Sequence, residues 1–265
     1  MSGARLREDF QLLRDAVEEA AVVARRFYDR GAKVWEKSPN NPVTEADLAV
    51  DDLLKRRLLG ARPDYGWLSE ETPDDGKRLD RKYVWVVDPI DGTRAFVRHH
   101  PEFAVAAGLV ADGEPIAGVV ANPATEEVFT ACKGGRVRAN GKLVAPAPAA
   151  TLTSARILGS RSAIERACGE LTGCEFFTVH SIAYRMALVA AGKYDAAVAM
   201  SPVCDWDIAA ADALVRAAGG RVTGSDGQDI VYNQANTRHV GVFAAKPTLH
   251  GQLLGRLTAG VASAG

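Results

Sequence analysis

The chain has 265 residues, 47% of them hydrophobic, and its formal net charge at pH 7 is −1. Such a chain can bury a large core as one layered unit or as two closely packed lobes. Its interspersed charges argue against binding to a nucleic acid polymer or to an anionic membrane. No apolar stretch approaches the roughly 18 residues that span a bilayer, and the N-terminal segment is charged, so we expect a cytoplasmic protein.

The cysteines give no sign of a zinc site or of a secreted disulfide scaffold. There are four, Cys132, Cys168, Cys174 and Cys204, and they form neither CxxC pairs nor a dense framework. We therefore expect them to be buried or half-buried thiols.

The first sixty residues are predicted to be mainly helical. Residues 5–30 carry apolar side chains at helical spacing, which predicts a long amphipathic helix. A loop that contains Lys37 is expected to follow. Thr44 then opens a second helix that runs to about Leu59, and Thr44 with Asp47 fits a capping box in which Asp replaces the usual Glu.

Residues 66–145 change to short apolar runs separated by turns. The runs cover residues 83–88, 103–110, 116–121 and 127–131, and the turns are Asp112-Gly113, Gly134-Gly135 and Asn140-Gly141. Alternation broken by such dipeptides is typical of hairpins, so we expect an antiparallel meander.

Beyond a small-residue hinge at Pro146 and Pro148, the pattern becomes mixed α/β. Strands are expected at 155–158, 175–179, 194–200 and 240–244, and helices at 163–171, 181–191, 207–218 and the C-terminus. Helices, then an antiparallel sheet, then mixed α/β predict a sandwich of stacked layers. We expect an N-terminal half over residues 1–148 and a C-terminal half over 149–265, packed as one compact unit.

Acidic residues gather at the ends of predicted strands and at a helix start. Asp88 and Asp91 follow the buried run 84–87, Glu70 and Glu71 follow another apolar run, and Asp205 and Asp207 flank Trp206. Because successive strand residues point to opposite faces, only one of Glu70 and Glu71 is expected to face a given site. Any one of these residues could be a turn former or a helix cap. Together, carboxylates without histidine or cysteine support favour a hard cation, Mg²⁺ or Mn²⁺, shared with a substrate phosphate.

Gly92 and Thr93 directly follow this acidic pair. Thr93 could begin a short helical turn whose free backbone N–H groups favour a phosphate, and Gly92 would let that backbone come close. Cations on one side and amides on the other would stabilise the charge of a transferring phosphoryl group. The residues therefore imply a small phosphate ester as substrate.

These segments resemble the signatures of the inositol monophosphatase superfamily of Mg²⁺-dependent, lithium-sensitive phosphomonoesterases. The resemblance rests on Lys37-Ser38-Pro39, Val43 to Asp47, Glu70-Glu71, the block Asp88-Pro-Ile-Asp-Gly-Thr93, and Trp206-Asp207 followed by Ile208-Ala209-Ala210. It extends over nearly the whole chain, and the six-residue block is highly specific. It implies an α+β fold, a five-layer αβαβα sandwich of the inositol monophosphatase and fructose-1,6-bisphosphatase type, with the site between its halves.

The resemblance also implies roles for single residues. Glu70, Asp88 and the Ile90 carbonyl would hold one ion, Asp88, Asp91 and Asp207 a second, and a third would sit near Glu70 with Asp47 in its outer shell. Thr93 and Glu70 would position and deprotonate the attacking water, while the Gly92 and Thr93 amides hold the phosphate and Asp91 lies beside the substrate. Family members often dimerise, so a homodimer is expected by analogy.

Substrate choice depends on residues outside this acidic set. Inositol phosphatases of the family carry a glutamate seven residues before the aspartate that matches Asp207, and here that position is Met200. A thioether cannot accept strong hydrogen bonds from a polyol. Ser181 to Tyr184 and the segment around Asp207 are similar to bacterial 3′(2′),5′-bisphosphate nucleotidases, which favours adenosine 3′,5′-bisphosphate. Arg161 could bind a second phosphate or lie at the surface as a helix-start arginine.

Several alternatives stay open from the sequence. The substrate could be inositol 1-phosphate, histidinol phosphate or a range of sugar phosphates, and the chain could be a non-catalytic regulatory binding protein, although Glu70 and Thr93 argue against that. Asp47 and Asp51 could lie near a cation, or Asp47 could only cap its helix while Asp51 is solvated. His99 and His100 are interpreted as a structural loop pair. Lys37 could neutralise a phosphate or simply cover the surface. Trp206 is expected to pack in the core.

Overall fold

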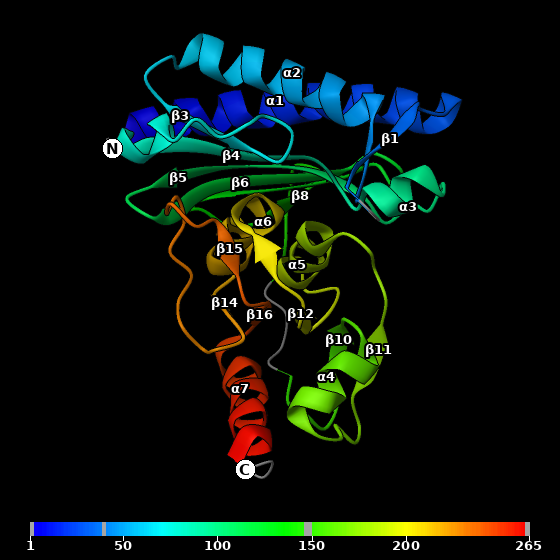
Figure 1. Cartoon of the computed structure of the whole chain (residues 1–265). Coiled ribbons are helices and arrows are strands. Elements are labelled where there is room, and N and C mark those ends of the chain that lie inside the picture. Colours follow the sequence, from blue (N-terminus) through cyan, green and yellow to red (C-terminus); the bar gives the residue numbers. More distant parts are fainter. Residues whose placement is uncertain (1–2, 39–40, 146–149, 263–265) are drawn as a thin grey trace.

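Five layers of secondary structure make up the protein (Figure 1). The computed structural model describes residues 3–38, 41–145 and 150–262. The helices are α1 (Gly3–Arg30), α2 (Glu45–Ala61), α3 (Thr93–Val97), α4 (Arg161–Cys168), α5 (Ile182–Ala190), α6 (Asp205–Ala217) and α7 (Pro247–Ala262). The α1/α2 pair covers a seven-stranded sheet, α5 and α6 lie between that sheet and a five-stranded one, and α4 and α7 form the outer layer. The expected αβαβα sandwich is confirmed.

The seven-stranded sheet is mostly a meander. Its strands are β3 (Gly66–Ser69), β4 (Tyr83–Asp91), β5 (Ala104–Ala111), β6 (Glu114–Asn122), β7 (Glu127–Cys132), β8 (Arg138–Ala139) and β9 (Lys142–Leu143), in that order. All neighbours are antiparallel except β3 and β4, which are parallel. The expectation of a purely antiparallel meander is wrong there. Parallel strands need a crossover, and a short 3₁₀ helix, η1 (Lys77–Asp80), lies in this one.

The second sheet has the order β11 (Glu175–Phe177), β10 (Arg156–Leu158), β12 (Ala196–Ala199), β16 (Val242–Ala245) and β14 (Arg221–Thr223). Strand β10 is parallel to both of its neighbours, and β16 is antiparallel to both of its own. The expected hinge at Pro146 and Pro148 lies outside the described residues.

Two small strand pairs were not expected. They are β1 (Val34–Ser38) with β2 (Asn41–Thr44), and β13 (Val203–Cys204) with β15 (Arg238–His239). The expected loop around Lys37 is therefore wrong, since Lys37 lies on β1. Every residue of β1 is exposed, so no apolar alternation marks it as a strand.

Helix α6 lies directly on the first sheet because two glycines leave room for its backbone. A Cβ atom added to Gly118 would come within 1.9 Å of the Ala210 carbonyl oxygen, and one added to Gly108 within 3.1 Å of the Ala210 nitrogen. The helix begins at Asp205, so the same contact holds its first turn close to the end of β4.

Two other expectations are answered by the described residues. The four cysteines are free, with Cys168 buried and the others half-buried, as expected. Among the helices of the described part of the chain, none combines the length and the apolar character needed to cross a membrane.

Candidate metal and phosphate site

The last residues of β4 bring two carboxylates to one side of the strand. Asp88 pairs with Ala106 of β5 and Asp91 with Ala104, so three steps on β4 match two on β5. Residues three apart on a regular strand point to opposite faces. The extra residue of β4 is a β-bulge, and it turns Asp88 and Asp91 to the same face. Asp88 and Asp91 are both buried, with 2% and 8% of their surface exposed. The expected convergence of this pair follows from the bulge.

Asp207 reaches the same region from the first turn of α6. It is the N3 residue of a capping box, and its carboxylate accepts a hydrogen bond from the backbone nitrogen of Cys204 (2.6 Å). Cys204 is thus the N-cap, and Asp207 lies three residues into the helix. The acidic N3 position is favoured by the positive end of the helix.

These three carboxylates resist ionisation. Burial, together with the charges of Glu70 and Asp91, raises the pKa of Asp88 well above its usual value. Burial raises the pKa of Asp91 to about 6, although hydrogen bonds from Ser181 and Ala183 oppose the shift. Burial and the charge of Asp91 raise the pKa of Asp207 to about 8. A divalent cation would oppose these shifts, because it would stabilise the ionised form of carboxylates that are buried close to one another.

None of the ion pairs between described residues involves Asp88, Asp91 or Asp207. Their hydrogen-bond partners are neutral: the Ile90 nitrogen for Asp88 (3.0 Å), and the Ser181 hydroxyl and Ala183 nitrogen for Asp91 (2.6 Å each). The residues therefore fit a hard cation. Within the described chain, however, their oxygens do not form a group of three that lie within 4.8 Å of one another, so the ligand set stays a prediction.

Glu70 and Glu71 share one lysine at the edge of this region. The Lys37 ammonium lies 3.3 Å from the Glu70 carboxylate and 2.5 Å from that of Glu71. Both glutamates can reach the same lysine because β3 ends at Ser69 and strand alternation ends with it. Which of the two faces the expected metal site stays a prediction. Burial raises the pKa of Glu71 to about 7 against the opposing effect of Lys37. Lys37 is therefore more than surface cover.

Thr93 is the first residue of α3 and lies between two of the expected site residues. Its hydroxyl is 3.0 Å from the Ile90 carbonyl oxygen and 3.4 Å from the Asp47 carboxylate. Asp47 also completes the capping box of α2, where it accepts from the Thr44 nitrogen (2.8 Å). Burial raises the pKa of Asp47 to about 6. Asp47 thus caps its helix, as expected, and at the same time contacts Thr93.

Asp51, one turn after Asp47, is not solvated. It is 8% exposed and accepts hydrogen bonds from the hydroxyls of Ser69 (2.5 Å) and Thr72 (2.6 Å). The alternative of a solvated Asp51 is wrong. These bonds tie α2 to the segment that carries Glu70.

Gly92 is the N-cap of α3 and has φ of 92°, in the left-handed region that favours glycine. A Cβ atom there would lie 3.0 Å from the Glu102 carbonyl oxygen. Both the conformation and the close approach require glycine, in agreement with its expected role beside a phosphate.

A hollow of approximately 650 Å³ lies around the start of α4 and is separate from the three buried carboxylates of the expected metal site, none of which lines it. Its lining includes Ser160, Arg161, Arg185 and Met200. Arg185 is close enough to Asp91 that the two charges influence each other, whereas burial lowers the pKa of Arg185. Arg161 begins α4, pairs with Glu165 (3.0 Å) and keeps 64% of its side chain exposed. The structure therefore brings Arg161 and Met200 to one hollow, with Arg161 accessible to a ligand.

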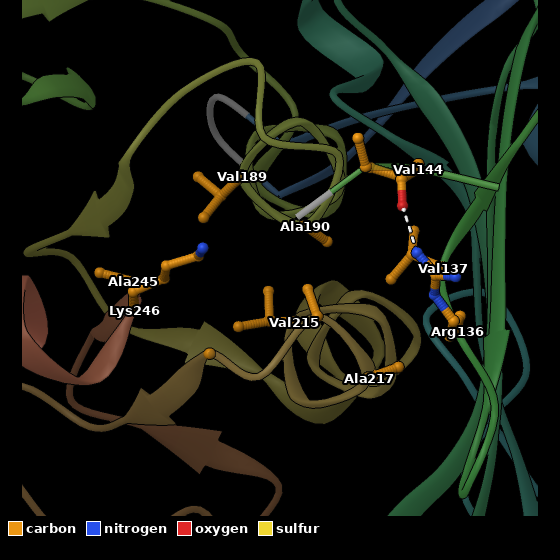
Figure 2. Close-up of a pocket in the computed structure, with 12 residues that line it drawn as sticks. Arg136, Val137, Val144, Val189, Ala190, Val215, Ala217, Ala245 and Lys246 are labelled. Atoms are coloured by element: carbon orange, nitrogen blue, oxygen red, sulfur yellow. Dashed lines mark hydrogen bonds between the residues drawn. The ribbon is translucent and has the colours of Figure 1, made fainter. Parts of the chain in front are cut away.

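A second, smaller cavity of approximately 90 Å³ lies between α5 and α6. Figure 2 shows Val189 and Ala190 facing Val215, with Arg136 and Lys246 at its edges. It contains none of the expected site residues. Its apolar lining belongs to the packing of the two central helices.

Sequence reasoning missed Ser181 and Arg185 as neighbours of Asp91, because they lie some ninety residues away along the chain. Ser181 caps α5, since its side chain accepts from the Tyr184 nitrogen (3.0 Å), and this cap could have been predicted from its serine. Asp205 does not join the acidic site: it accepts from the Asn233 nitrogen (2.8 Å) and from His239 (2.6 Å). Trp206 is half-buried and packs against the central core, as expected.

Comparisons with known proteins point to one family. The model of the inositol monophosphatase family matches residues 5–261. An inositol-1-monophosphatase of Rhizobium meliloti is 32% identical over 219 residues, covering 77% of this chain and 80% of the relative. The 3′(2′),5′-bisphosphate nucleotidase CysQ of Aggregatibacter actinomycetemcomitans is 32% identical and covers 84% and 88%. The histidinol-phosphatase of Mycobacterium tuberculosis is 34% identical and covers 94% and 96%.

Solved structures carry the same fold. An inositol monophosphatase of Thermotoga maritima superposes with a TM-score of 0.80 at 26% identity, covering 99% of this chain and 100% of that one. Relatives with three different named activities match at nearly equal identity, so the shared part is the phosphatase core. The chain therefore belongs to the inositol monophosphatase family and is a phosphatase, a phosphoric monoester hydrolase.

Proposed function

We propose that this phosphatase is Mg²⁺-dependent and removes a phosphate from a small bisphosphorylated nucleotide such as adenosine 3′,5′-bisphosphate. The observation that supports this substrate class is the hollow lined by Arg161, Arg185 and Met200, since the charge of Arg185 also acts on Asp91. A second phosphate needs a cation that lies apart from the reacting phosphate, and an adenine ring needs apolar surface.

Glu70, Asp88, Asp91 and Asp207, with the Ile90 carbonyl oxygen, would hold two ions, with a third near Glu70. When bound, Mg²⁺ would supply positive charge that stabilises the phosphoryl oxygens and makes water more acidic. Mn²⁺ has the same preference for oxygen ligands. The raised pKa values of Asp88, Asp91 and Asp207 support this ligand set, since each comes from burial and the three carboxylates form no ion pair between described residues.

The reacting water would be oriented by Thr93 and Glu70. Thr93 can donate only one proton, and both the Ile90 carbonyl and the Asp47 carboxylate lie within its reach. Its oxygen lone pairs are then left to accept a hydrogen bond from the water. Asp47, with its pKa raised to about 6, could take up a proton through Thr93.

The substrate phosphate would lie against the amides of Gly92 and Thr93 at the start of α3. Gly92 allows the left-handed backbone conformation, with φ of 92°, from which α3 begins. Arg161 would bind the second phosphate, because its exposed guanidinium can turn from Glu165 toward the hollow. Met200 would contact the base.

A second candidate substrate is histidinol phosphate. The relative with that named activity matches the largest shares of both chains among the three compared. Glu165, which also lines the hollow, could pair with an amine on the substrate. The hollow would have to bind a negative phosphate in the bisphosphate but a positive amine in histidinol phosphate. Kinetics with the two substrates can therefore separate the candidates.

The test measures phosphate release in Mg²⁺ with adenosine 3′,5′-bisphosphate, inositol 1-phosphate and histidinol phosphate. We expect the highest kcat/KM for the bisphosphate, and Arg161→Gln should lower that value about tenfold, as expected for one charge-assisted hydrogen bond. It should leave inositol 1-phosphate unaffected, because that substrate has no second phosphate.

Arg166→Gln is the matched control, since Arg166 is also an exposed arginine of α4 but does not line the hollow. A preference for either of the other two substrates would overturn the nucleotide assignment. No release from any of the three would contradict the choice of substrate class as a whole.

A further inference from the structure

Two histidines and a glutamate meet outside the carboxylate region. They are His100 and Glu102, between α3 and β5, and His180, two residues before α5. Among the described residues they form the one group of three His, Cys, Asp or Glu side chains whose ligand atoms all lie within 4.8 Å of one another. We infer that this His100–Glu102–His180 cluster is a second metal site, for a transition-metal ion such as Zn²⁺.

The donor set separates this cluster from the carboxylate region. Imidazole nitrogens suit Zn²⁺ and its neighbours in the first transition series, whereas Mg²⁺ prefers oxygen ligands only. Two histidines and one glutamate with a fourth position open to water is a known zinc arrangement. The side chains are 53%, 28% and 39% exposed for His100, Glu102 and His180, so an ion can enter from solvent.

The distances are close to those that a bound ion requires. Glu102 Oε2 lies 2.9 Å from Nδ1 of His180 and 3.8 Å from Nδ1 of His100. Two ligand atoms at zinc bond lengths in a tetrahedral site lie about 3.3 Å apart, between these two values. The imidazole rings stand edge to face, with centroids 5.7 Å apart and an interplanar angle of 84°, so neither ring blocks the other.

The backbone already holds the two segments together. The Ser181 nitrogen donates to the Glu102 carbonyl oxygen (3.1 Å), which links the residue after His180 to Glu102. The His100 nitrogen donates to the Ala95 carbonyl (2.9 Å), and the Asn122 side chain donates to the Pro101 carbonyl (2.8 Å). Little order would have to be created on binding, because all three ligands come from tethered backbone.

An ion here would connect the loop after α3 to the start of α5. Ser181 lies at that junction, and its hydroxyl also binds Asp91 (2.6 Å). The second site would therefore reinforce the contact that positions Asp91, without contributing a ligand to the carboxylate region. This inference does not depend on the identity of the phosphatase substrate.

The experiment loads the full-length protein with Zn²⁺ in the presence of excess Mg²⁺, removes unbound metal and measures retained zinc by elemental analysis. The excess Mg²⁺ competes with zinc for the oxygen ligands, and the histidine variants show whether the retained zinc belongs to the cluster. Wild type is expected to retain one equivalent, and His100→Ala and His180→Ala are each expected to lose it. Cobalt(II) provides a second readout, because a site with two imidazoles gives visible absorption bands stronger than those of an all-oxygen octahedral site.

His99→Asn is the matched control. His99 is the exposed neighbour of His100, lies outside the cluster and has φ of 53°, which asparagine tolerates. It should retain one equivalent of zinc. Phosphate release in Mg²⁺ checks that each variant is folded, and His100→Ala should keep that activity. The inference would be overturned if wild type retained no zinc. It would also be overturned if His100→Ala and His180→Ala each retained as much zinc as wild type.

Discussion

Buried carboxylates occur in two different settings in this protein. Asp9 and Asp212 are both fully buried, and each binds an arginine and a tyrosine. Asp9 accepts from Arg62 (2.6 Å) and Tyr65 (2.6 Å), and Asp212 accepts from Arg216 (2.7 Å) and Tyr232 (2.9 Å).

Asp88 and Asp91 are almost as deeply buried, yet their bonded partners are amides and a hydroxyl, and their nearest charges include other carboxylates. Burying several ionised acids next to one another destabilises a fold unless a counter-charge is supplied. For Asp9 and Asp212, an arginine of the chain supplies the positive charge. For Asp88 and Asp91, the positive charge must come from an ion in solution, and this difference separates the functional carboxylates from the structural ones.

The largest effect on stability is expected from breaking the structural setting. Asp212→Asn removes the charge that Arg216 pairs with and should lower the free energy of unfolding by about 3 kcal/mol, the lower end for a broken buried pair. The lower end applies because Arg216 is 38% exposed and keeps contact with water. Chemical denaturation measures the change, and activity per folded molecule should be unaltered. If Asp212→Asn left the free energy of unfolding unchanged, the contrast between the arginine-paired acids and the acids of the metal site would not hold.

The matched change in the functional setting should do the opposite. Asp91→Asn keeps an oxygen that can accept from Ser181 and Ala183, so the fold should persist. Phosphate release in Mg²⁺ should fall by more than about 100-fold, since loss of an outer partner of a metal ligand already costs about 10- to 100-fold and a direct ligand should cost more. Stability without metal should not decrease, because one of the repelling charges is gone. Substantial residual turnover would count against Asp91 as a ligand.

A smaller effect is expected from pH. The folded-state pKa values of Asp91, about 6, and Asp207, about 8, lie above the usual value of 3.8. The folded protein therefore binds more protons than the unfolded chain between about pH 4 and pH 8, and the stability of the metal-free protein should decrease as pH rises through that window.

Thermal unfolding with a chelator and with Mg²⁺ measures this pH effect. Bound Mg²⁺ should flatten the dependence, because it keeps both carboxylates ionised in the folded state. If the stability of the metal-free protein rose with pH across this window, the negative charges of Asp91 and Asp207 would be balanced by groups of the chain, and the contrast would fail.

Local spacing carries most of what the sequence predicts about the site. Asp88, Asp91, Gly92 and Thr93 lie within six residues, so their chemistry and their turn could be predicted together. The capping box of Thr44 and Asp47 is local in the same way and is confirmed. The layered fold follows from the order of helical and strand-like patterns.

The rest depends on contacts between distant segments. Nothing in the spacing of Ser181 indicates that it binds Asp91, ninety positions earlier. Lys37 lies on a fully exposed strand, where side chains give no periodic signal, yet it joins Glu70 and Glu71. The parallel pairing of β3 with β4 is likewise decided by a crossover whose path the sequence does not encode locally.

The contact of Gly118 with Ala210 places a limit on how this molecule can change. The spacing between the central helix and the sheet is fixed where two main chains touch, not by the length of interlocking side chains. Even one added methyl group at residue 118 would overlap the helix and tilt its leading turn, and Asp207 with it. Gly118 has no reactive group, yet a substitution there is expected to disturb the site because it would move Asp207.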